Sequence, residues 1–442
     1  MKLRDLVIAT AVLAVLLGVL YWSNHHKPSE DTDVKASADA PVNILSLNQV
    51  DIIRLTIHHK DLPQLDLSRN GSGVWQITVP KALAADQETV SGVLSTLSSL
   101  RAERLIDDKA SDLATYGLSV PPLDIQCTLK DNKTQKLLVG DQTPAGNAYY
   151  AMLMGDPRVF TIASFNKTSL DKTANDLRDK RLLTADFDKV SQIEVTSRKQ
   201  DITFARVKDA WQILKPKPLR ADANQVDDLI RTLREAKMDT SSDTDDTENT
   251  AAFGIASPLA IARITGGSGT QELEVRKAKD VYYAKSSMLS GIYKVPASVG
   301  TGLDKSLHDF LNKKLFDFGY QDPDKIEIHD GSKSYFLTRS GSDWWGPDGK
   351  KLDEATVQKL ISKIRDLSAE KFPTSGFTTP SLELTVLSND NKRVEKVLVA
   401  KNGETSIARR ENEPALYEIS ISAVAELQKA AADLKPAPDP TK

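Results

Sequence analysis

The sequence contains very little cysteine and histidine. Cys127 is the single cysteine among 442 residues, so no disulfide can form within the chain and the hydrophobic core must hold the fold together. The histidines are scattered, and His58 and His59, neighbours on a predicted strand, must point to opposite faces of the sheet. The Cys and His spacings of zinc sites are absent, so we predict no metal-binding residues.

An excess of charge of either sign is also lacking. The chain has 58 basic and 61 acidic residues and a net charge of −3 at pH 7. A nucleic-acid-binding surface needs a basic face, so we expect no nucleic-acid partner. The length allows roughly two to four domains. The content of 40% hydrophobic and 27% charged residues is typical of a folded protein.

Local catalytic motifs are absent. There is no Walker loop, H-E-x-x-H, C-x-x-C or G-x-S-x-G. The glycine-rich residues 266–269 favour a hairpin turn, and the S-x-x-K match at Ser164 and Lys167 lacks its companion motifs. We therefore predict no catalytic residues, no cofactor and no enzyme activity. Carboxylates assembled from distant segments leave no local motif, so an envelope hydrolase of unrecognised type stays open as an alternative.

Residues 243–249 (D-T-D-D-T-E-N) resemble part of a calcium-binding loop. Glu248 stands where such a loop needs glycine, and no bidentate glutamate follows at the right distance. The segment is therefore interpreted as a solvated loop. Asp107, Asp108 and Asp112 fall in the corresponding place of an earlier repeat, and weak cation binding there stays open.

One long apolar run is present. It begins at Leu6 and ends at Trp22, and its 17 residues carry no charge, the short end of what spans a bilayer as a helix. Lys2 and Arg4 precede it, so residues 1–5 are predicted in the cytoplasm and the bulk of the chain in the periplasm. We predict an uncleaved signal anchor in the inner membrane, residues 6–22. A cleaved signal peptide is the alternative.

Polar segments flank the part of the chain that is expected to fold. Residues 23–46 are polar and contain prolines, which predicts a flexible tether between the membrane and the folded part. Residues 435–442 (K-P-A-P-D-P-T-K) form a proline-rich segment of the same character, predicted to be a disordered tail.

Internal repetition dominates the rest of the sequence. A tryptophan is followed five residues later by a proline at Trp75 and at Trp211, and a shortened form begins at Trp344. An aspartate then precedes a stretch with apolar residues at i, i+3, i+4 and i+7, the pattern of an amphipathic helix. We expect the tryptophans to pack in the core and the aspartates to cap the helices. The capping positions are Asp86, Asp222 and Asp353.

A Gly-x-x-x-Pro segment follows each of these helices, at Gly117, Gly254 and Gly376, and is predicted to be a turn with positive φ. Runs with period-two alternation come next, then a second helix. The second helices are predicted at residues 164–177, 303–312 and 422–434. We predict an α+β fold of three tandem, mutually similar domains of antiparallel strands with two helices each, preceded by the transmembrane helix. The domains are residues 47–184, 185–318 and 319–434.

Four motifs occur in the order W-x4-P, A-D-x3-V, Y-G-L-x2-P and L-R-D-K-R-L-L. In these motifs the sequence resembles a bacterial family of membrane-anchored proteins catalogued as a domain of unknown function. The resemblance extends from Leu6 to about Leu434. Members are associated with ABC-2-type transporters, including auxiliary components of gliding motility. The resemblance implies an accessory extracytoplasmic role and supplies no catalytic residues. The third repeat departs from the pattern, because it lacks the Trp-to-Pro spacing and the Tyr-Gly-Leu.

We therefore expect a non-enzymatic, membrane-anchored periplasmic scaffold or accessory subunit of an ABC-2-type export system, with the permease and the ATPase as partners. A cell-wall or polysaccharide binding module is the alternative, because exposed aromatic rings can stack on sugars. The aromatic residues that could do so include Tyr149, Tyr150, Tyr282, Tyr283, Trp344 and Trp345.

Overall fold

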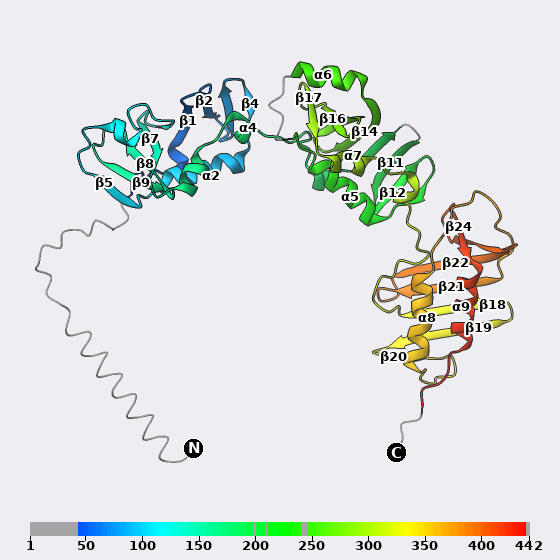
Figure 1. Ribbon diagram of the computed structural model, residues 1–442. Coiled ribbons are helices and arrows are strands. Elements are labelled where there is room, and N and C mark those ends of the chain that lie inside the picture. Colours follow the sequence, from blue (N-terminus) through cyan, green and yellow to red (C-terminus); the bar gives the residue numbers. More distant parts are fainter. Residues whose placement is uncertain (1–42, 198–199, 209, 240–245, 439–442) are drawn as a thin grey trace, which may run out of the picture. The chain divides into compact units, whose positions relative to one another are not determined.

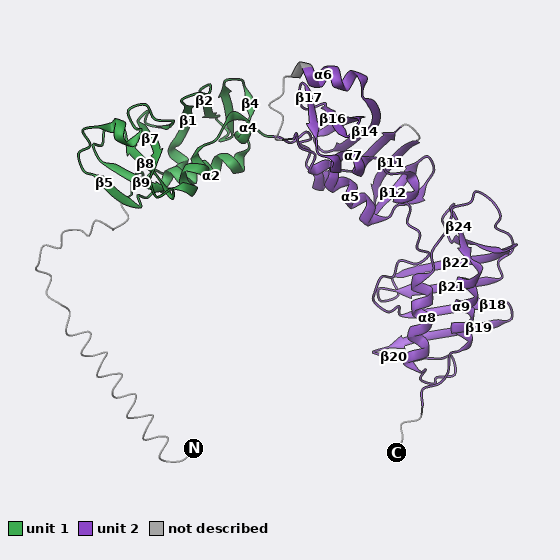
Figure 2. Ribbon diagram, viewed as in Figure 1, with its two compact units in different colours: residues 1–179 green, residues 180–442 purple. Residues whose placement is uncertain are grey.

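The computed structural model describes residues 43–438, apart from 198–199, 209 and 240–245. These residues form three sheets in two compact units (Figures 1 and 2). The first unit ends at Asp179 and contains the first sheet. The second unit begins at Lys180 and contains the second and third sheets.

The first sheet has nine strands in the order β4-β3-β2-β1-β6-β7-β8-β9-β5. They are β1 (Ile52–His59), β2 (Leu65–Arg69), β3 (Trp75–Val79), β4 (Leu83–Ala84), β5 (Arg104–Asp107), β6 (Leu123–Leu129), β7 (Thr134–Gln142), β8 (Ala148–Leu153) and β9 (Val159–Ala163). The helices are α2 (Gln87–Ser98), α3 (Ser164–Leu170) and α4 (Ala174–Leu177), with short 3-10 turns η1 (Gln49–Asp51) and η2 (Leu113–Tyr116).

The second sheet has eight strands in the order β13-β12-β11-β10-β14-β15-β16-β17. They are β10 (Gln192–Ser197), β11 (Gln200–Val207), β12 (Ala210–Lys215), β13 (Leu219–Arg220), β14 (Ser257–Gly266), β15 (Gly269–Ala278), β16 (Val281–Ser286) and β17 (Ile292–Val295). The helices are α5 (Ala223–Arg234), α6 (Asp246–Ile255) and α7 (Ala297–Leu303), with the 3-10 turns η3 (Phe187–Lys189) and η4 (Leu307–Phe310).

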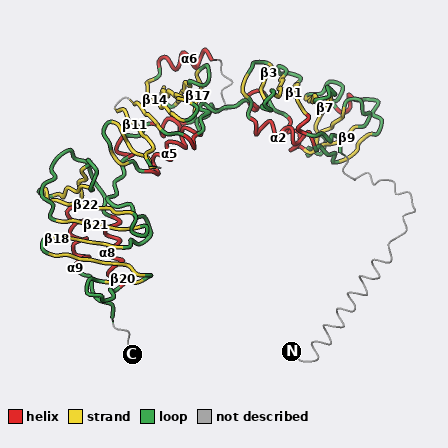
Figure 3. The backbone as a smooth tube through the Cα atoms, turned by 180° about the vertical axis from the view of Figure 1, so that it is seen from behind, coloured by secondary structure: helices red, strands yellow, loops and turns green. Residues whose placement is uncertain are grey.

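The third sheet has seven strands in the order β20-β19-β18-β21-β22-β23-β24. They are β18 (Lys325–Asp330), β19 (Lys333–Ser340), β20 (Asp343–Trp345), β21 (Leu382–Ser388), β22 (Arg393–Asn402), β23 (Thr405–Arg410) and β24 (Leu416–Ser420). The helices are α8 (Glu354–Asp366) and α9 (Ile421–Ala432), which lie side by side against one face of the sheet (Figures 1 and 3).

The three sheets share one topology. In each, the first strand pairs antiparallel with a strand that comes after the amphipathic helix in the sequence: β1 with β6, β10 with β14, and β18 with β21. The helix therefore crosses over one face, and the chain continues as a meander of neighbouring strands. The first sheet has one additional strand, β5, which follows α2 and pairs with β9 at the sheet edge. The repeated sequence motifs thus correspond to a repeated order of strands, as expected when a sequence pattern reflects one folding unit.

Each sheet has one face covered by helices, and the opposite face is called here the open face. In the second sheet, α6 lies on the open face and packs against β15, β16 and β17. Along β21, Leu382, Leu384 and Val386 are buried, whereas Glu383 and Thr385 between them are partly exposed. This alternation is the period-two pattern that a half-buried strand requires. The buried side chains form one hydrophobic core in the first unit and a continuous core beneath both sheets of the second unit, which also has a small separate cluster around Tyr283.

The Gly-x-x-x-Pro segment has the same role in all three repeats, because its aromatic residue packs on the open face. The Tyr116 ring meets the Tyr150 ring of β8 edge-on at 5.1 Å between centroids. Phe253 of α6 packs against Tyr283 of β16. In the third repeat, the Arg409 guanidinium of β23 lies 4.7 Å from the centre of the Phe377 ring. The motif therefore covers one end of each open face.

The predicted helix caps and tryptophan positions are confirmed. Asp86 accepts hydrogen bonds from two backbone N–H groups of α2, Asp222 from two of α5, and Asp353 from one of α8. The three aligned tryptophans, Trp75, Trp211 and Trp344, are buried.

Replacing Asp222 by alanine is expected to lower the free energy of unfolding of the second unit by about 1 kcal/mol, because two N–H groups of α5 lose their acceptor. Urea denaturation measures the change. Asp222→Asn keeps a capping oxygen and should lose much less. An equal loss in both variants would contradict the capping role.

The predicted fold class is wrong in its proportions. The described chain is mostly antiparallel sheet, and its helices are short. Alternating apolar residues outnumber helical stripes along most of each repeat, so strands dominate the fold. The predicted transmembrane helix, residues 6–22, lies outside the described residues. Within the part that the structure describes, no helix is long and apolar enough to cross a membrane.

Two helices per domain is also wrong for the first two repeats. The predicted helix at residues 164–177 is divided into α3 and α4. In the predicted helix at residues 303–312, Leu303 is the last residue of α7, and only the 3-10 turn η4 follows. The same device interrupts both: Asp176 accepts from the backbone N–H of Thr173, and Asp309 from that of Ser306. Each pair forms a capping box that starts a new helical turn. The alanine-rich α9 has no such interruption.

The glycine prediction holds in two repeats and fails in one. Gly117 has φ +67° and Gly376 has φ +106°, the left-handed conformations that glycine tolerates. Gly254 instead lies within α6, which spans Asp246–Ile255. The prediction of a loop at residues 243–249 is wrong for residues 246–249, which belong to α6. Residues 243–245 lie outside the described part of the chain. Tyr282 packs on the side of α7, so Tyr283 and α6 occupy the opposite face.

Candidate functional site

The histidine pair is divided between the two faces of the first sheet, as predicted. His58 approaches Asp124 at 3.3 Å on the open face. His59 is hydrogen-bonded through Nε2 to Asp171 Oδ1 at 2.7 Å beneath the helices. Lys167 donates to the other oxygen of Asp171, so the lysine of the S-x-x-K match serves this carboxylate. Both histidines therefore have a carboxylate partner within the fold.

Asp171, His59 and Lys167 form a cluster that makes the free energy of unfolding of the first unit depend on pH in the acid range. Burial opposes ionisation of this carboxyl group, but hydrogen bonds from Lys167 and His59 hold its pKa below the usual value of 3.8. A carboxyl group whose pKa is lower in the folded state stabilises the fold above its unfolded pKa. That stabilisation is lost as the pH falls through the folded pKa.

Asp171→Asn is therefore expected to cost about 1–3 kcal/mol at pH 7, the usual contribution of hydrogen bonds to a charged group. The difference from the parent protein should shrink progressively below about pH 4, where the parent carboxylate also becomes protonated. Urea unfolding of the first unit between pH 7 and pH 2 measures this. A difference that stays constant across this range would contradict the assignment.

The remaining residues considered for chemistry are placed as follows. Asp112 caps η2, and Asp107 accepts a hydrogen bond from the Tyr116 hydroxyl at 3.3 Å. Cys127 is buried, and burial raises the pKa of its thiol to about 12, so it carries no reactive thiolate at neutral pH. Among the described residues, no three His, Cys, Asp or Glu side chains lie close enough to hold a metal ion.

The aromatic residues considered for sugar stacking lie mostly inside the protein. Those that are buried or half-buried are Tyr149, Tyr150, Tyr282, Tyr283 and Trp344. Trp345 differs, because 37% of its surface is exposed on the open face of the third sheet. Phe336 is exposed on the same face, since Trp345 pairs with Thr338 and Phe336 lies two residues further along β19.

The densest group of charges lies within the second unit, where the segment leading into the third sheet meets both sheets. Three arginines and three carboxylates form it, and we call it the junction network. Its members are Arg220, Asp317, Arg393, Glu395, Arg410 and Glu413. Arg220 comes from β13 of the second sheet, whereas Arg393, Glu395 and Arg410 come from β22 and β23 of the third sheet. The network therefore joins two repeats.

Glu395 is the most deeply buried member, with 4% of its surface exposed. Its carboxylate lies 3.1 Å from Arg410 and 3.3 Å from Arg393, and it accepts the backbone N–H of Asp317 at 3.0 Å. Asp317 in turn pairs with Arg220 and lies 3.5 Å from Arg393. Such complete pairing offsets the cost of removing a carboxyl group from water.

Two groups at the network, Arg410 and the adjacent Tyr417, have shifted pKa values. Burial works against the charge of Arg410, but the carboxylates of Glu413, Glu395 and Asp317 raise its pKa above the usual value. Burial raises the pKa of Tyr417 to about 12, and its hydroxyl donates to Glu413 at 2.9 Å. These groups keep one protonation state at physiological pH, so they supply fixed charges and fixed hydrogen bonds.

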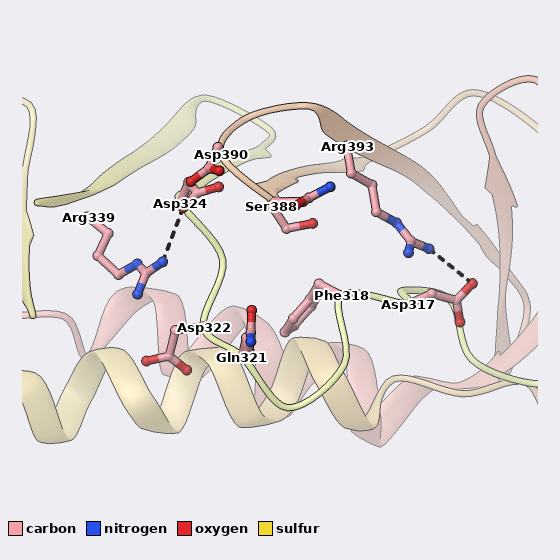
Figure 4. A pocket seen from close by; sticks show the side chains of 10 residues that line it. Asp317, Phe318, Gln321, Asp322, Asp324, Arg339, Ser388, Asp390 and Arg393 are labelled. Carbon is pink, nitrogen blue, oxygen red and sulfur yellow. Dashed lines mark hydrogen bonds and ion pairs between the residues drawn. The ribbon is translucent and has the colours of Figure 1, made fainter. Parts of the chain in front are cut away.

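A polar hollow of about 360 Å³ borders the network (Figure 4). The segment with Asp317, Phe318 and Asp322 lies along one side of it, and Arg339 and Arg393 approach from the strands opposite. Arg339 pairs with Asp324 at 3.1 Å. The backbone N–H of Asn391 and the Arg339 guanidinium hold the pKa of Asp324 below its usual value, against the opposing effect of burial. The carboxylates of Asp317 and Asp324 are thus both paired with arginines.

The structure defines a class: a tandem-repeat protein whose antiparallel sheets have a shared topology and whose second and third repeats are joined by buried ion pairs. The family model described as "Domain of unknown function (DUF4340)" matches residues 75–213 and 211–381. The protein belongs to this family. The two matches begin at or near Trp75 and Trp211, the first residues of the repeated motif.

Other comparisons add little. No curated protein matches the chain. Among solved structures, a DNA polymerase sliding clamp from Pseudomonas aeruginosa has a TM-score of 0.15 and 8% identity, covering 87% of this chain and 94% of its own. A DNA polymerase III subunit beta from the same organism has a TM-score of 0.14 and 8% identity, covering 85% and 94%. TM-scores of this size do not indicate a shared fold.

Proposed function

We propose that the protein is a non-enzymatic scaffold or accessory subunit of an ABC-2-type export system, located on the periplasmic side of the inner membrane. The observation that carries the proposal is the junction network. Each carboxylate of the network is paired with an arginine, and these ion pairs join the second repeat to the third. A joined pair of sheets offers a partner a large surface of fixed shape, as a scaffold requires.

The resemblance of the sequence motifs to transporter-associated proteins supports the choice of partner. The open faces support the role, because a polar sheet surface without covering helices can bury against another protein. On the first sheet, such a surface is lined by Arg54, Gln126 and Lys136. On it, the Asp66 carboxylate accepts a hydrogen bond from Thr56, and the Asp124 carboxylate pairs with Lys136.

Crosslinking in cells, followed by purification of the full chain from membranes and mass spectrometry, tests this function. We expect to recover an ABC permease and its ATPase, with crosslinks concentrated on lysines of the open faces such as Lys136 and Lys396. Lys429 lies on α9, away from the open face, and serves as an internal control. Recovery without either transporter component would overturn the proposal. Fractionation of the same cells tests the location.

A second candidate function, binding of cell-wall polysaccharide, is favoured by Trp345 and Phe336, which are both exposed on one sheet face. Sedimentation with purified cell-wall polysaccharide would measure it. Trp345→Ala should reduce the bound fraction several-fold if these rings stack on sugar. Phe165→Ala removes an exposed ring elsewhere and should have no effect. Absence of binding by the parent protein would eliminate this candidate.

A further inference from the structure

The three repeats share an arginine that sequence inspection overlooked. An arginine stands directly opposite the aligned tryptophan on the neighbouring strand in every sheet. The pairs are Arg69 with Trp75, Arg206 with Trp211, and Arg339 with Trp344. In the sequence each arginine precedes its tryptophan by five or six residues. A comparison of the three pairs shows which of these arginines have a hydrogen-bond or ion-pair partner within their own repeat.

Two of the three arginines are bound within their own repeat. Arg69 donates to the carbonyl oxygen of Gly73 at 2.8 Å. Arg339 pairs with the Asp324 carboxylate at 3.1 Å. The backbone N–H of Arg339 also donates to the Asp324 carbonyl, and that of Arg206 donates to the Ser191 carbonyl in the same way. Ser191 thus stands where the third repeat has Asp324, and it offers Arg206 no carboxylate.

Arg206 is therefore an exposed guanidinium with no hydrogen-bond acceptor or carboxylate among the described residues. It lies 5.3 Å from the centre of the Trp211 ring, a cation–π contact that leaves its N–H groups unused. Trp211 has an unused donor as well. The residue is 93% buried, and its Nε1–H has no partner in the described part of the protein. A buried donor without an acceptor is costly.

Both side chains line a hollow of about 630 Å³ on the second-sheet side of the junction network. Its wall contains four arginines and three acidic residues, and the adjoining carboxylate of Glu395 pairs with two of these arginines. Arg220, Arg393 and Arg410 are paired with the carboxylates of the network. Asp227 at the start of α5 is exposed and makes no ion pair among the described residues. Arg206 is thus the arginine of this wall that makes no ion pair among the described residues, and it lies beside the indole of Trp211, whose N–H is also unused.

We propose that this hollow is a binding site for a carboxylate ligand, with Arg206 as the charged anchor and the Trp211 indole N–H as a second donor. Guanidinium and indole N–H are donor-only groups, so the matching ligand is an acceptor of negative charge. The carboxylate belongs either to a small free acid or to an acidic side chain of a bound protein segment. The site does not depend on the export role proposed above.

The test follows the Trp211 indole by ¹⁵N NMR in the full chain, assigned from the signal that Trp211→Phe removes. Two probes are titrated: glutarate, and a peptide of eight residues rich in glutamate, with the glutamine version of that peptide as a neutral comparison. We expect a saturable shift of the Trp211 indole signal with at least one acidic probe and none with the glutamine peptide. A shift with glutarate identifies a free-acid site, and a shift with the acidic peptide alone identifies a protein segment.

Arg206→Gln should weaken binding at least tenfold while the thermal unfolding midpoint of the second unit stays unchanged, because the side chain is exposed. Arg69→Gln is the matched control, since it removes the equivalent arginine from the first repeat and should leave the affinity intact. The absence of a Trp211 shift with both acidic probes would overturn the proposal. Equal affinity in Arg206→Gln and the parent protein would overturn it too.

Discussion

Glu395→Ala is expected to lower the free energy of unfolding of the second unit by about 3–5 kcal/mol, the largest effect of any single charge in the described chain. The substitution leaves Arg410 and Arg393 without the carboxylate that lies 3.1 and 3.3 Å away. It also removes the acceptor of the Asp317 backbone N–H. The physical cause is that the buried Arg410 guanidinium loses one of its carboxylate partners and the Asp317 N–H loses its acceptor, rather than lost packing. Differential scanning calorimetry should show the second unit unfolding roughly 10 °C lower.

Glu383→Ala provides the matched control within the same sheet. Glu383 pairs with Lys396 at 3.2 Å, but both side chains reach solvent, and exposed pairs contribute less than about 1 kcal/mol. Similar losses in the two variants would show that burial of the junction network adds nothing to stability. Glu395→Gln separates charge from volume, because it keeps the shape of the side chain and removes only the negative charge.

Phe160→Ala is expected to destabilise the first unit by about 3–5 kcal/mol, the usual cost of deleting a buried phenylalanine ring. Phe160 lies in β9, pairs with Leu105 of β5 and Ala151 of β8, and belongs to the core of the first unit. The cores of the two units are separate clusters. Calorimetry should therefore show a lower transition temperature for the first unit and an unchanged transition for the second.

Phe165→Ala is the matched control for this substitution. Phe165 lies in the same unit on α3, but 71% of its surface is exposed, so its removal should change stability by no more than about 0.5 kcal/mol. A shift of both transitions in Phe160→Ala would contradict the division of the chain into two independently folded units at Asp179.

Short-range features were predictable from the sequence because their causes are local. Asp86 and Asp222 cap their helices through backbone N–H groups two and three residues away, so the sequence contains both partners. In β21, the alternation of apolar and polar residues is enough to predict that Leu382, Leu384 and Val386 face the core. The interruption of the second helices was also encoded locally, in the Thr173–Asp176 and Ser306–Asp309 spacings, but the apolar periodicity concealed it.

The candidate site was not predictable in the same way. In the sequence, 97 residues separate Arg220 from Asp317, and 78 separate Asp317 from Glu395. No local pattern marks these residues as partners. Gly254 shows the limit of repeat reasoning, because the same Gly-x-x-x-Pro spacing forms a turn in two repeats and lies partly in α6 in the other. The arginine before each tryptophan was a usable signal, since it recurs at nearly constant spacing.

By itself the sequence determined that the chain repeats three times, which residues face the cores, where the amphipathic helices begin and that no disulfide holds the fold. Each of these depends on residue type and on spacings of a few positions. Only the tertiary structure decided that the second and third repeats share a core, that Glu395 is buried between two arginines and that Arg206 lacks the acceptor given to Arg339. Those outcomes depend on which distant segments meet, and the burial and pairing of a charge are properties of that meeting.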